Sequence, residues 1–312
     1  MATPTTQKDK VDALKRILNA PSVVEQFKNA LNDNASTFIA SVIDLYNTDS
    51  KLQLCDQKQV VMAALQAAVL KLPINKALGY AYIIPYANNK KVLDPATGKE
   101  VWQKVMEPTF QMGYKGYIQF ALRTGQYRTI NAGFACEGEI SSFDKLTGKL
   151  CLTGTPTSDK VIGYFAYIEL LNGFNKAYYM TVEQMAAHAK QYSKGLSADT
   201  TVESLIALAA TQRTPDGKLT GWKGNFHAMA LKTVLRLLLS KYGYLSIEMQ
   251  NAIAKDLSEE NVDTNVDDIK DEAVSAKPAP AVIDFGESAG ETVAVEHVET
   301  PKVEAESEEP GF

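Results

Sequence analysis

The segment Gly79-Tyr80-Ala81-Tyr82-Ile83-Ile84-Pro85-Tyr86 is the point where the sequence changes from helical to extended patterning. Its aromatic and β-branched residues are typical of a β-strand. A turn signal follows at Asp94-Pro95-Ala96-Thr97-Gly98, and Val101-Trp102-Gln103-Lys104-Val105-Met106 has the composition of a second strand. The sequence therefore predicts an antiparallel β-hairpin in the middle of the chain.

Before this hairpin, residues 1–72 carry apolar side chains at helical spacing. The groups are Val11, Leu14, Ile17 and Leu18; Val23, Val24, Phe27 and Leu31; Phe38, Val42 and Leu45; and Val61, Leu65, Ala68 and Leu72. Pro73 is expected to stop the last of these helices. The sequence therefore predicts a helical N-terminal part.

After the hairpin, the patterns predict further helices and strands. Helices are expected at 111–123, from a capping box at Thr181-Val182-Glu183-Gln184 to about Tyr192, at 201–211 and at 222–242; strands are expected at 128–138, 161–171 and 176–181. Asn172-Gly173 should join the last two strands in a tight hairpin. The fold class is α+β, with a small antiparallel sheet and a β-hairpin flanked by helices.

The charge is distributed very unevenly along the 312 residues. The last 58 residues, 255–312, hold 17 acidic and 4 basic side chains, whereas 1–254 hold 20 acidic and 28 basic ones. A basic body suits a polyanionic partner, and an acidic, weakly apolar end suits a solvated tail. We expect a folded core over 1–255 and a disordered acidic tail over 256–312.

The basic centre lies between Lys71 and Arg128, where nine Lys or Arg face three acidic residues. Cations neutralise phosphates, aromatic faces stack on bases and amides fix register on a single strand. The DNA-binding candidates here are Lys104, Gln111, Tyr114, Lys115, Gln119, Arg123, Tyr127 and Arg128. Four of them, at 111, 115, 119 and 123, would share one face of the expected helix. A solvated polar stripe is the alternative interpretation.

Two glycines in the same helix, Gly113 and Gly116, each cost about 1 kcal/mol of helix stability relative to alanine. Close approach of another backbone, either protein or phosphodiester, would explain them. The last expected helix repeats the spacing of cations with Lys232 and Arg236, although its broad apolar surface indicates a core helix. Lys223 and Asn225 precede it, where backbone N–H groups favour phosphate.

Other functional classes find little support in the sequence. It contains no P-loop, HExxH or GxSxG pattern, and its scattered cysteines and histidines do not predict a zinc site. No apolar run is long enough to span a membrane, and the N-terminus does not resemble a secretory signal, so we expect a cytoplasmic protein. Glu137, Glu139 and Asp144 suggest a metal-dependent nuclease, but a solvated strand end is the preferred interpretation. We expect no catalytic residues and no bound metal.

Three passages together resemble the RecT family of phage recombination proteins. They are Leu78 to Tyr86; Phe110 to Tyr117 with Arg123-Thr124-Gly125-Gln126; and Trp222, Phe226 and Met229 with Lys232-Thr233-Val234-Leu235-Arg236. The resemblance covers about residues 35–245. One departure is Gly221-Trp222, where the family's familiar pattern is Pro-Trp.

The resemblance implies a protein that binds single-stranded DNA, assembles into rings or helical filaments, and anneals complementary strands without ATP during phage homologous recombination. Some family members work better with Mg²⁺. The resemblance also implies a phage exonuclease as a partner, host single-strand binding protein as another, and a bacterial host cytoplasm as the location. It places Gln111, Lys115, Arg123 and Arg128 at the DNA groove, with Lys232 and Arg236 as weaker candidates.

The acidic tail ends in Glu308-Glu309-Pro310-Gly311-Phe312, which resembles the C-terminal peptide of bacterial single-strand binding proteins. An ordinary acidic tail is the simpler interpretation, and we expect the tail either to compete with DNA or to bind a host factor. Three alternatives to annealing stay open: a coating protein or RNA chaperone, the nuclease described above, and a structural oligomer whose basic face is incidental.

Overall fold

The computed structural model of the chain describes residues 7–93, 100–193, 195–212 and 219–259. The chain divides into two units, Met1–Asp263 and Thr264–Phe312, and every described residue belongs to the first. Apart from its first four residues, the tail expected over 256–312 lies outside the described residues. The structure has the expected α+β class, with a helical N-terminal part and small antiparallel sheets flanked by helices.

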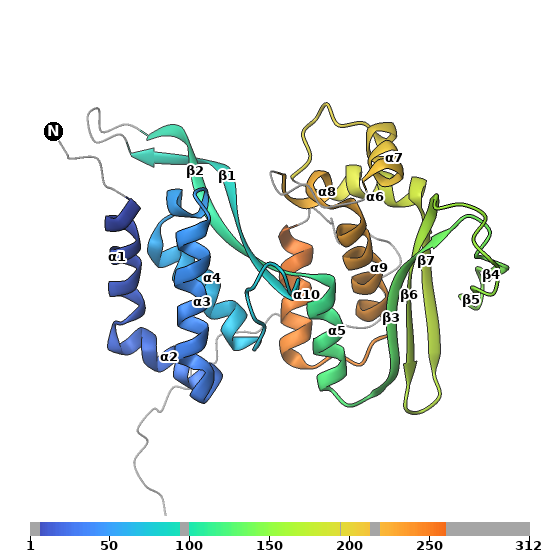
Figure 1. Cartoon of the computed structure of the whole chain (residues 1–312), viewed down its shortest axis with the longest axis horizontal. Coiled ribbons are helices and arrows are strands. Elements are labelled where there is room, and N and C mark those ends of the chain that lie inside the picture. The colour runs from blue at the N-terminus through green and yellow to red at the C-terminus, as the bar shows by residue number, and fades with distance from the viewer. Residues whose placement is uncertain (1–6, 94–99, 194, 213–218, 260–312) are drawn as a thin grey trace, which may run out of the picture. The chain divides into compact units, whose positions relative to one another are not determined.

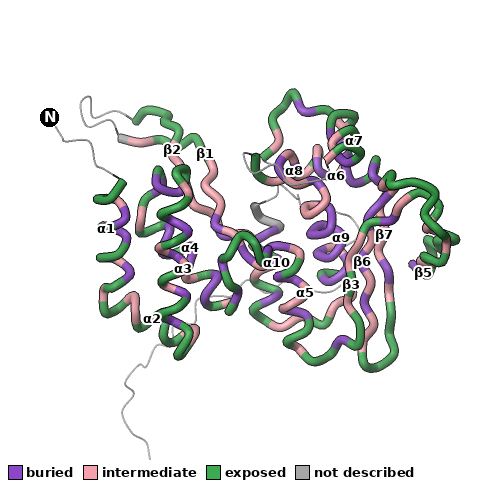
Figure 2. Tube along the Cα trace, in the orientation of Figure 1, coloured by how far each residue is buried: buried purple, intermediate pink, exposed green. Residues whose placement is uncertain are grey.

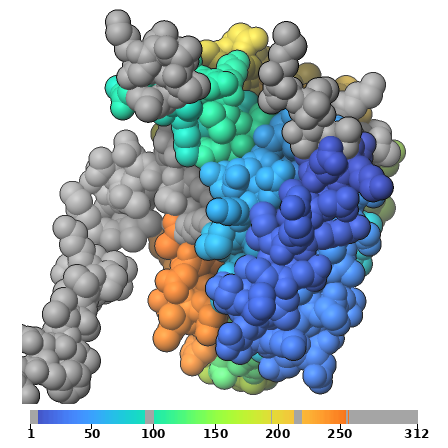
Figure 3. All heavy atoms as spheres, turned by 90° about the vertical axis from the view of Figure 1, so that its left-hand side faces the viewer, coloured from blue at the N-terminus to red at the C-terminus, as the bar shows by residue number. Residues whose placement is uncertain are grey.

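Four helices form the N-terminal part and cover one side of this unit (Figures 1 and 3). They are α1 (Gln7–Leu18), α2 (Pro21–Leu31), α3 (Ala35–Thr48) and α4 (Gln57–Val69), with short 3-10 helices at Asn32–Asn34 and Leu52–Leu54. The predicted apolar faces are confirmed, because Leu14, Phe27 and Val42 are fully buried. The last helix ends at Val69, four residues before the proline that was expected to stop it.

The predicted hairpin is confirmed and is longer than expected. Strands β1 (Ala81–Leu93) and β2 (Glu100–Met112) pair antiparallel over their whole length. Its outer half, 87–91 and 100–104, is exposed (Figure 2). The turn predicted at 94–98 lies outside the described residues. Because β2 continues to Met112, the helix expected from residue 111 begins later, as α5 (Tyr114–Arg123).

A three-stranded antiparallel sheet follows, in the order β3-β6-β7. Its strands are β3 (Tyr127–Cys136), β6 (Val161–Leu170) and β7 (Asn175–Thr181), as predicted. Between β3 and β6, the short strands β4 (Ser142–Asp144) and β5 (Lys149–Cys151) form a hairpin that the sequence did not predict. Helix α6 (Val182–Tyr192) begins with the predicted capping box, in which Thr181 and Gln184 bond each other's backbone N–H.

The C-terminal helices differ from expectation in two ways. The elements are α7 (Val202–Thr211), α8 (Gly221–Gly224), α9 (Phe226–Tyr242) and α10 (Ile247–Glu259). The single helix expected over 222–242 is broken at Asn225, which caps α9. The prediction that this helix would be the last ordered element was wrong, because α10 follows and buries Met249 and Ile253.

Helix α9 is the central helix of the C-terminal half. It packs on all three strands of the β3-β6-β7 sheet, and α5, α7, α8 and α10 also contact it. Most of its length is therefore buried (Figure 2). None of the described helices combines the length and the apolar content that crossing a membrane requires.

Candidate nucleic-acid interface

The two glycines at the start of α5 are explained by protein backbone. A Cβ atom at Gly113 would lie 2.2 Å from the carbonyl oxygen of Gly79, and one at Gly116 would lie 2.3 Å from that of Tyr80. The N–H of Gly113 also donates to the Tyr80 carbonyl at 2.9 Å. The close approach inferred from the sequence is thus made by the chain preceding β1, and it fixes α5 against the base of the hairpin.

The expected four-residue stripe on α5 is only partly realised. Gln111 belongs to β2 and not to the helix, so it does not share the helical face. Lys115 is exposed, whereas Gln119 and Tyr114 are half-buried, and Tyr114 packs against the core. Among Gln111, Tyr114, Lys115 and Gln119, Lys115 is therefore the residue most accessible to a strand.

Arg123, the last residue of α5, joins the helix to the N-terminal part. Its guanidinium donates to the carbonyl oxygens of Leu70 and Lys71 at 2.7 and 2.8 Å, and it lies 5.3 Å from the centre of the Phe120 ring. Partial burial lowers the pKa of Arg123. The last carbonyls of a helix lack partners within the helix, so Arg123 caps the end of α4.

The next two candidates, Tyr127 and Arg128, differ in burial. Tyr127 is buried and its hydroxyl donates to the Tyr244 carbonyl at 3.0 Å, while burial raises the pKa of Tyr127 to about 12. Arg128 is exposed and lies 3.0 Å from the Glu169 carboxylate on the neighbouring strand. A phosphate can therefore reach Arg128 by replacing an exposed ion pair, which contributes little stability.

The outer half of the β1–β2 hairpin carries exposed cations beside an exposed aromatic ring. The indole of Trp102 is 70% exposed, and the Lys91 ammonium lies 5.8 Å from its centre. Lys104 is exposed on the same strand, directly opposite Asn89. Ring and cations together have the composition of a stacking and phosphate-binding surface.

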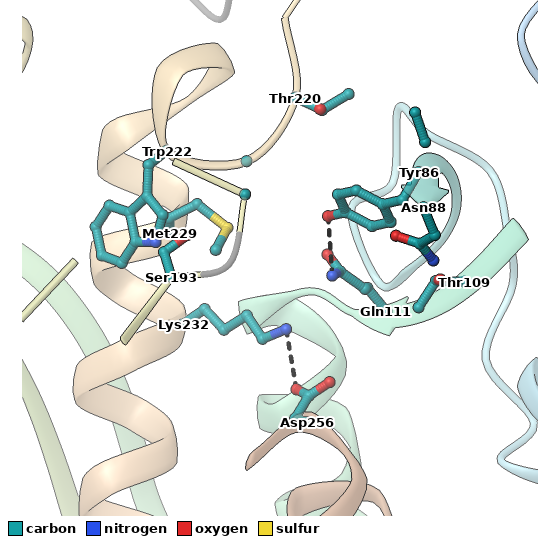
Figure 4. A pocket seen from close by; sticks show the side chains of 13 residues that line it. Tyr86, Asn88, Thr109, Gln111, Ser193, Thr220, Trp222, Met229, Lys232 and Asp256 are labelled. Carbon is teal, nitrogen blue, oxygen red and sulfur yellow. Dashed lines mark hydrogen bonds and ion pairs between the residues drawn. The ribbon is translucent and has the colours of Figure 1, made fainter. Parts of the chain in front are cut away.

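A cavity of about 500 Å³ lies between the hairpin and helices α8, α9 and α10 (Figure 4). Its lining includes Tyr86, Asn88, Thr109, Gln111, Ser193, Thr220, Trp222, Met229, Lys232 and Asp256. Among the candidates from the sequence, Gln111 and Lys232 line this cavity. The amide of Gln111 donates to the Tyr86 hydroxyl at 3.0 Å, so this side of the cavity is held by a hydrogen bond across the hairpin.

The opposite side of the cavity depends on the junction between α8 and α9. The Gln212 side chain accepts from the Phe226 N–H at 2.7 Å and donates to the carbonyls of Lys223 and Gly224. Gly221 begins α8 with a φ of +61°, which proline cannot adopt. The departure from Pro-Trp therefore corresponds to a different local backbone conformation, not to a lost helix.

The candidates Lys223 and Asn225 at this junction already have partners in the protein. The Asn225 side chain accepts from the Ala228 N–H at 3.0 Å, as a helix N-cap does. The Lys223 ammonium donates to the Ser197 hydroxyl at 3.1 Å and remains half-buried. Asn225 thus has a structural role, and Lys223 sits close to the surface beside the cavity.

The two cations of α9 are buried: Lys232 is 6% exposed and Arg236 is 1% exposed. The Lys232 ammonium lies 2.9 Å from the Asp256 carboxylate of α10, and the Tyr117 hydroxyl of α5 donates to the same carboxylate oxygen. Sequence reasoning missed Asp256, because it assigned that residue to the tail. The signal that could have found it is the spacing of Met249, Ile253 and Asp256 on one helical face.

The carboxylates considered for a nuclease bond to nearby backbone or hydroxyl groups instead. Glu139 accepts from the Cys136 N–H, Glu137 accepts from the Ser158 hydroxyl at 3.0 Å, and Asp144 accepts from the Leu146 N–H at 2.9 Å. Within the part of the chain that the structure describes, no three His, Cys, Asp or Glu side chains gather closely enough to hold a metal ion.

Comparison with known proteins matches the chain to one family model and to two relatives. The model of the RecT family matches residues 36–274. The uncharacterized protein YqaK of Bacillus subtilis (strain 168) is 39% identical over 268 residues, covering 85% of this chain and 80% of that protein. Protein RecT of Escherichia coli (strain K12) is 28% identical over 248 residues, covering 78% of this chain and 79% of that protein. The chain therefore belongs to the RecT family.

Proposed function

We propose that the protein binds single-stranded DNA without sequence specificity and anneals complementary strands without ATP, as a homo-oligomer acting in phage homologous recombination. The observation that carries the proposal is the family match over 36–274, since membership of the RecT family supports a role in single-strand annealing and recombination. Annealing requires phosphates to be neutralised while base edges stay available to a second strand. The exposed cations of the hairpin and of α5 supply the first requirement.

In this proposal Lys104, Lys115 and Arg128 contact phosphates, because all three are exposed. Trp102 offers a face for stacking, and Gln111 fixes the strand at the edge of the cavity. Contacts of this kind do not read bases, so complementarity is tested by the two strands themselves. Arg123, Tyr127 and Asn225 act indirectly in this scheme, by holding the elements that carry the contacts.

The proposal also assigns partners and conditions. Neither ATP nor a metal ion is required, and Mg²⁺ acts at most as a stimulant. A phage exonuclease supplies resected strands, host single-strand binding protein meets the acidic C-terminal segment, and the location is the cytoplasm of the bacterial host. The N-terminal helices supply subunit contacts, so deletion of 1–33 should reduce particle size in light scattering more than it reduces DNA contact.

A sequential annealing assay tests the proposal. The protein is first incubated with one oligonucleotide, and its labelled complement is then added without ATP, beside a non-complementary control. Fast pairing that depends on complementarity, retained in a large protein–DNA complex, is the expected result. Binding that slows pairing would make this a coating protein, cleavage in Mg²⁺ would favour a nuclease, and no binding at low salt would leave only a structural oligomer.

A further inference from the structure

Asp256 lies where the acidic C-terminal segment meets the cavity. The segment 255–312 holds 17 acidic and 4 basic residues, and Asp256 is its first acidic residue. Helix α10 places this carboxylate against Lys232 at the wall of the cavity, with both side chains almost fully buried (Figure 4). Asp256 thus already pairs with a cation of the candidate DNA site.

The groups around the Asp256 carboxylate would suit a phosphate equally well. One carboxylate oxygen of Asp256 forms an ion pair with the Lys232 ammonium and accepts a hydrogen bond from the Tyr117 hydroxyl. An ammonium and a hydroxyl donor are also what a phosphate oxygen takes in charge-assisted hydrogen bonds. Because the pair is shielded from solvent, salt screens it less than it screens the exposed pairs of the hairpin.

Helix α10 is attached mainly through one apolar edge, which makes its release feasible. Met249 and Ile253 are buried, whereas Ile247 at its start is 75% exposed. The helix contacts α9 and β2, so undocking it would leave the sheet and the N-terminal helices in place. Elements with few buried apolar side chains open at a lower free energy than the core does.

We propose that α10 is an internal competitor of DNA: Asp256 holds the position of a phosphate at Lys232, and a bound strand displaces it. The inference rests on the proposed function, since it assumes that a strand enters this cavity. By linkage, whatever stabilises the docked α10 weakens DNA binding, and bound DNA loosens α10 by the same factor.

Hydrogen exchange on the full wild-type chain, with and without oligodeoxythymidylate, tests the displacement directly. Bound DNA should speed exchange of the α10 amides at 247–259 by about fivefold or more, the lower end of ordinary coupling between sites. Amides of the β1–β2 hairpin should become slower in the same sample. Exchange in α10 that is unchanged or slower would overturn the inference.

An affinity measurement with Asp256→Asn tests the competition. The variant should bind oligodeoxythymidylate about fivefold tighter or more, because the competing charge is gone. Asp49→Asn is the matched control: it removes one negative charge and the 2.7 Å pair with Lys76, which lies outside the cavity. Equal gains in the two variants would reduce the effect to net charge and overturn the inference.

Adding Lys232→Gln to the Asp256→Asn variant separates the site from the rest of the surface. The gain in affinity should disappear, because the phosphate then lacks its cation; a retained gain would contradict the assignment of Lys232. If Asp256→Asn does not fold, hydrogen exchange on the wild type still decides. If the wild type does not bind DNA at all, the proposed function fails first, whereas DNA binding with an undisturbed α10 removes only this inference.

Discussion

Helices α5 and α9 carry cations at the same four-residue spacing but place them in opposite environments. Lys115 and Arg123 on α5 are exposed, whereas Lys232 and Arg236 on α9 are almost fully buried. A spacing of four fixes only that two residues share a face. Whether that face meets water depends on the elements that pack on it, and α9 is covered by α10, which the sequence did not predict.

This difference in burial implies two different roles for a cationic side chain. An exposed lysine is hydrated, and it can exchange bound water for a phosphate contact at little cost in free energy. A buried lysine needs an anionic partner, because an unpaired charge in the interior is strongly destabilising. Lys115 on α5 should therefore affect DNA affinity, while the cations on α9 should affect folding first.

The largest effect expected from this comparison is that of Lys232→Met. It leaves the Asp256 carboxylate buried without its cation, so we expect a loss of about 3 kcal/mol in the free energy of unfolding in urea. Combining it with Asp256→Asn should restore at least about half of that loss, since both charges are then gone. A loss below about 1 kcal/mol for the single variant would mean that the pair behaves as an exposed one.

Gly116→Ala should come next. Alanine favours helices by about 1 kcal/mol over glycine, yet its Cβ would lie 2.3 Å from the Tyr80 carbonyl oxygen and 2.7 Å from a Met112 side-chain carbon. The clash is expected to win, with a net loss of about 2 kcal/mol in thermal or urea unfolding. Gly195→Ala is the control, because its Cβ would meet nothing closer than 3.8 Å. A stabilised Gly116→Ala would contradict the close packing of α5 on the chain before β1.

Arg123→Gln and Lys115→Gln sharpen the comparison within α5 itself. The first removes the cap on the end of α4 and should cost about 1 kcal/mol of stability, since the guanidinium is only partly buried. The second should leave stability unchanged and flatten the log–log salt dependence of DNA binding by about 0.7, the share of one phosphate on a single strand. Equal effects of the two variants on both measurements would remove the distinction.

The local patterns of this sequence predicted most of the fold. Apolar periodicity located α1 to α4, the capping box at Thr181 marked the start of α6, and Asn172-Gly173 marked the turn between β6 and β7. These signals lie within a few residues of one another along the chain. Helix α10 carried a local signal of the same kind in the spacing of Met249, Ile253 and Asp256, but the acidic composition of the segment outweighed it; what no local pattern could show is that Asp256 pairs with Lys232.

For the candidate site, too, local sequence signals were informative and contacts between distant residues were not. Composition identified the basic centre and the hairpin, and the family resemblance identified the segment around Trp222. Neither could show that Tyr127 bonds the Tyr244 carbonyl or that Arg123 bonds the end of α4. Those pairs join residues 117 and 52 positions apart, and a helical or strand period carries no information at that range.

The smallest predicted effect concerns pH and the exposed hairpin. Hydrogen bonds from Asn88 and then Lys90 hold the pKa of Glu107 below its ordinary value of 4.5. A carboxylate whose pKa is depressed in the folded state adds stability above its unfolded pKa and loses it as the pH falls through the folded one. Wild type should therefore lose more stability than Glu107→Gln between pH 7 and about pH 3.5 in urea unfolding. The difference should be a few tenths of a kcal/mol, as for other exposed pairs. A difference as large as the loss of unfolding free energy expected for Lys232→Met would mean that the Glu107 pair behaves as a buried one. The lysines of the hairpin could not then exchange a carboxylate for a phosphate at little cost.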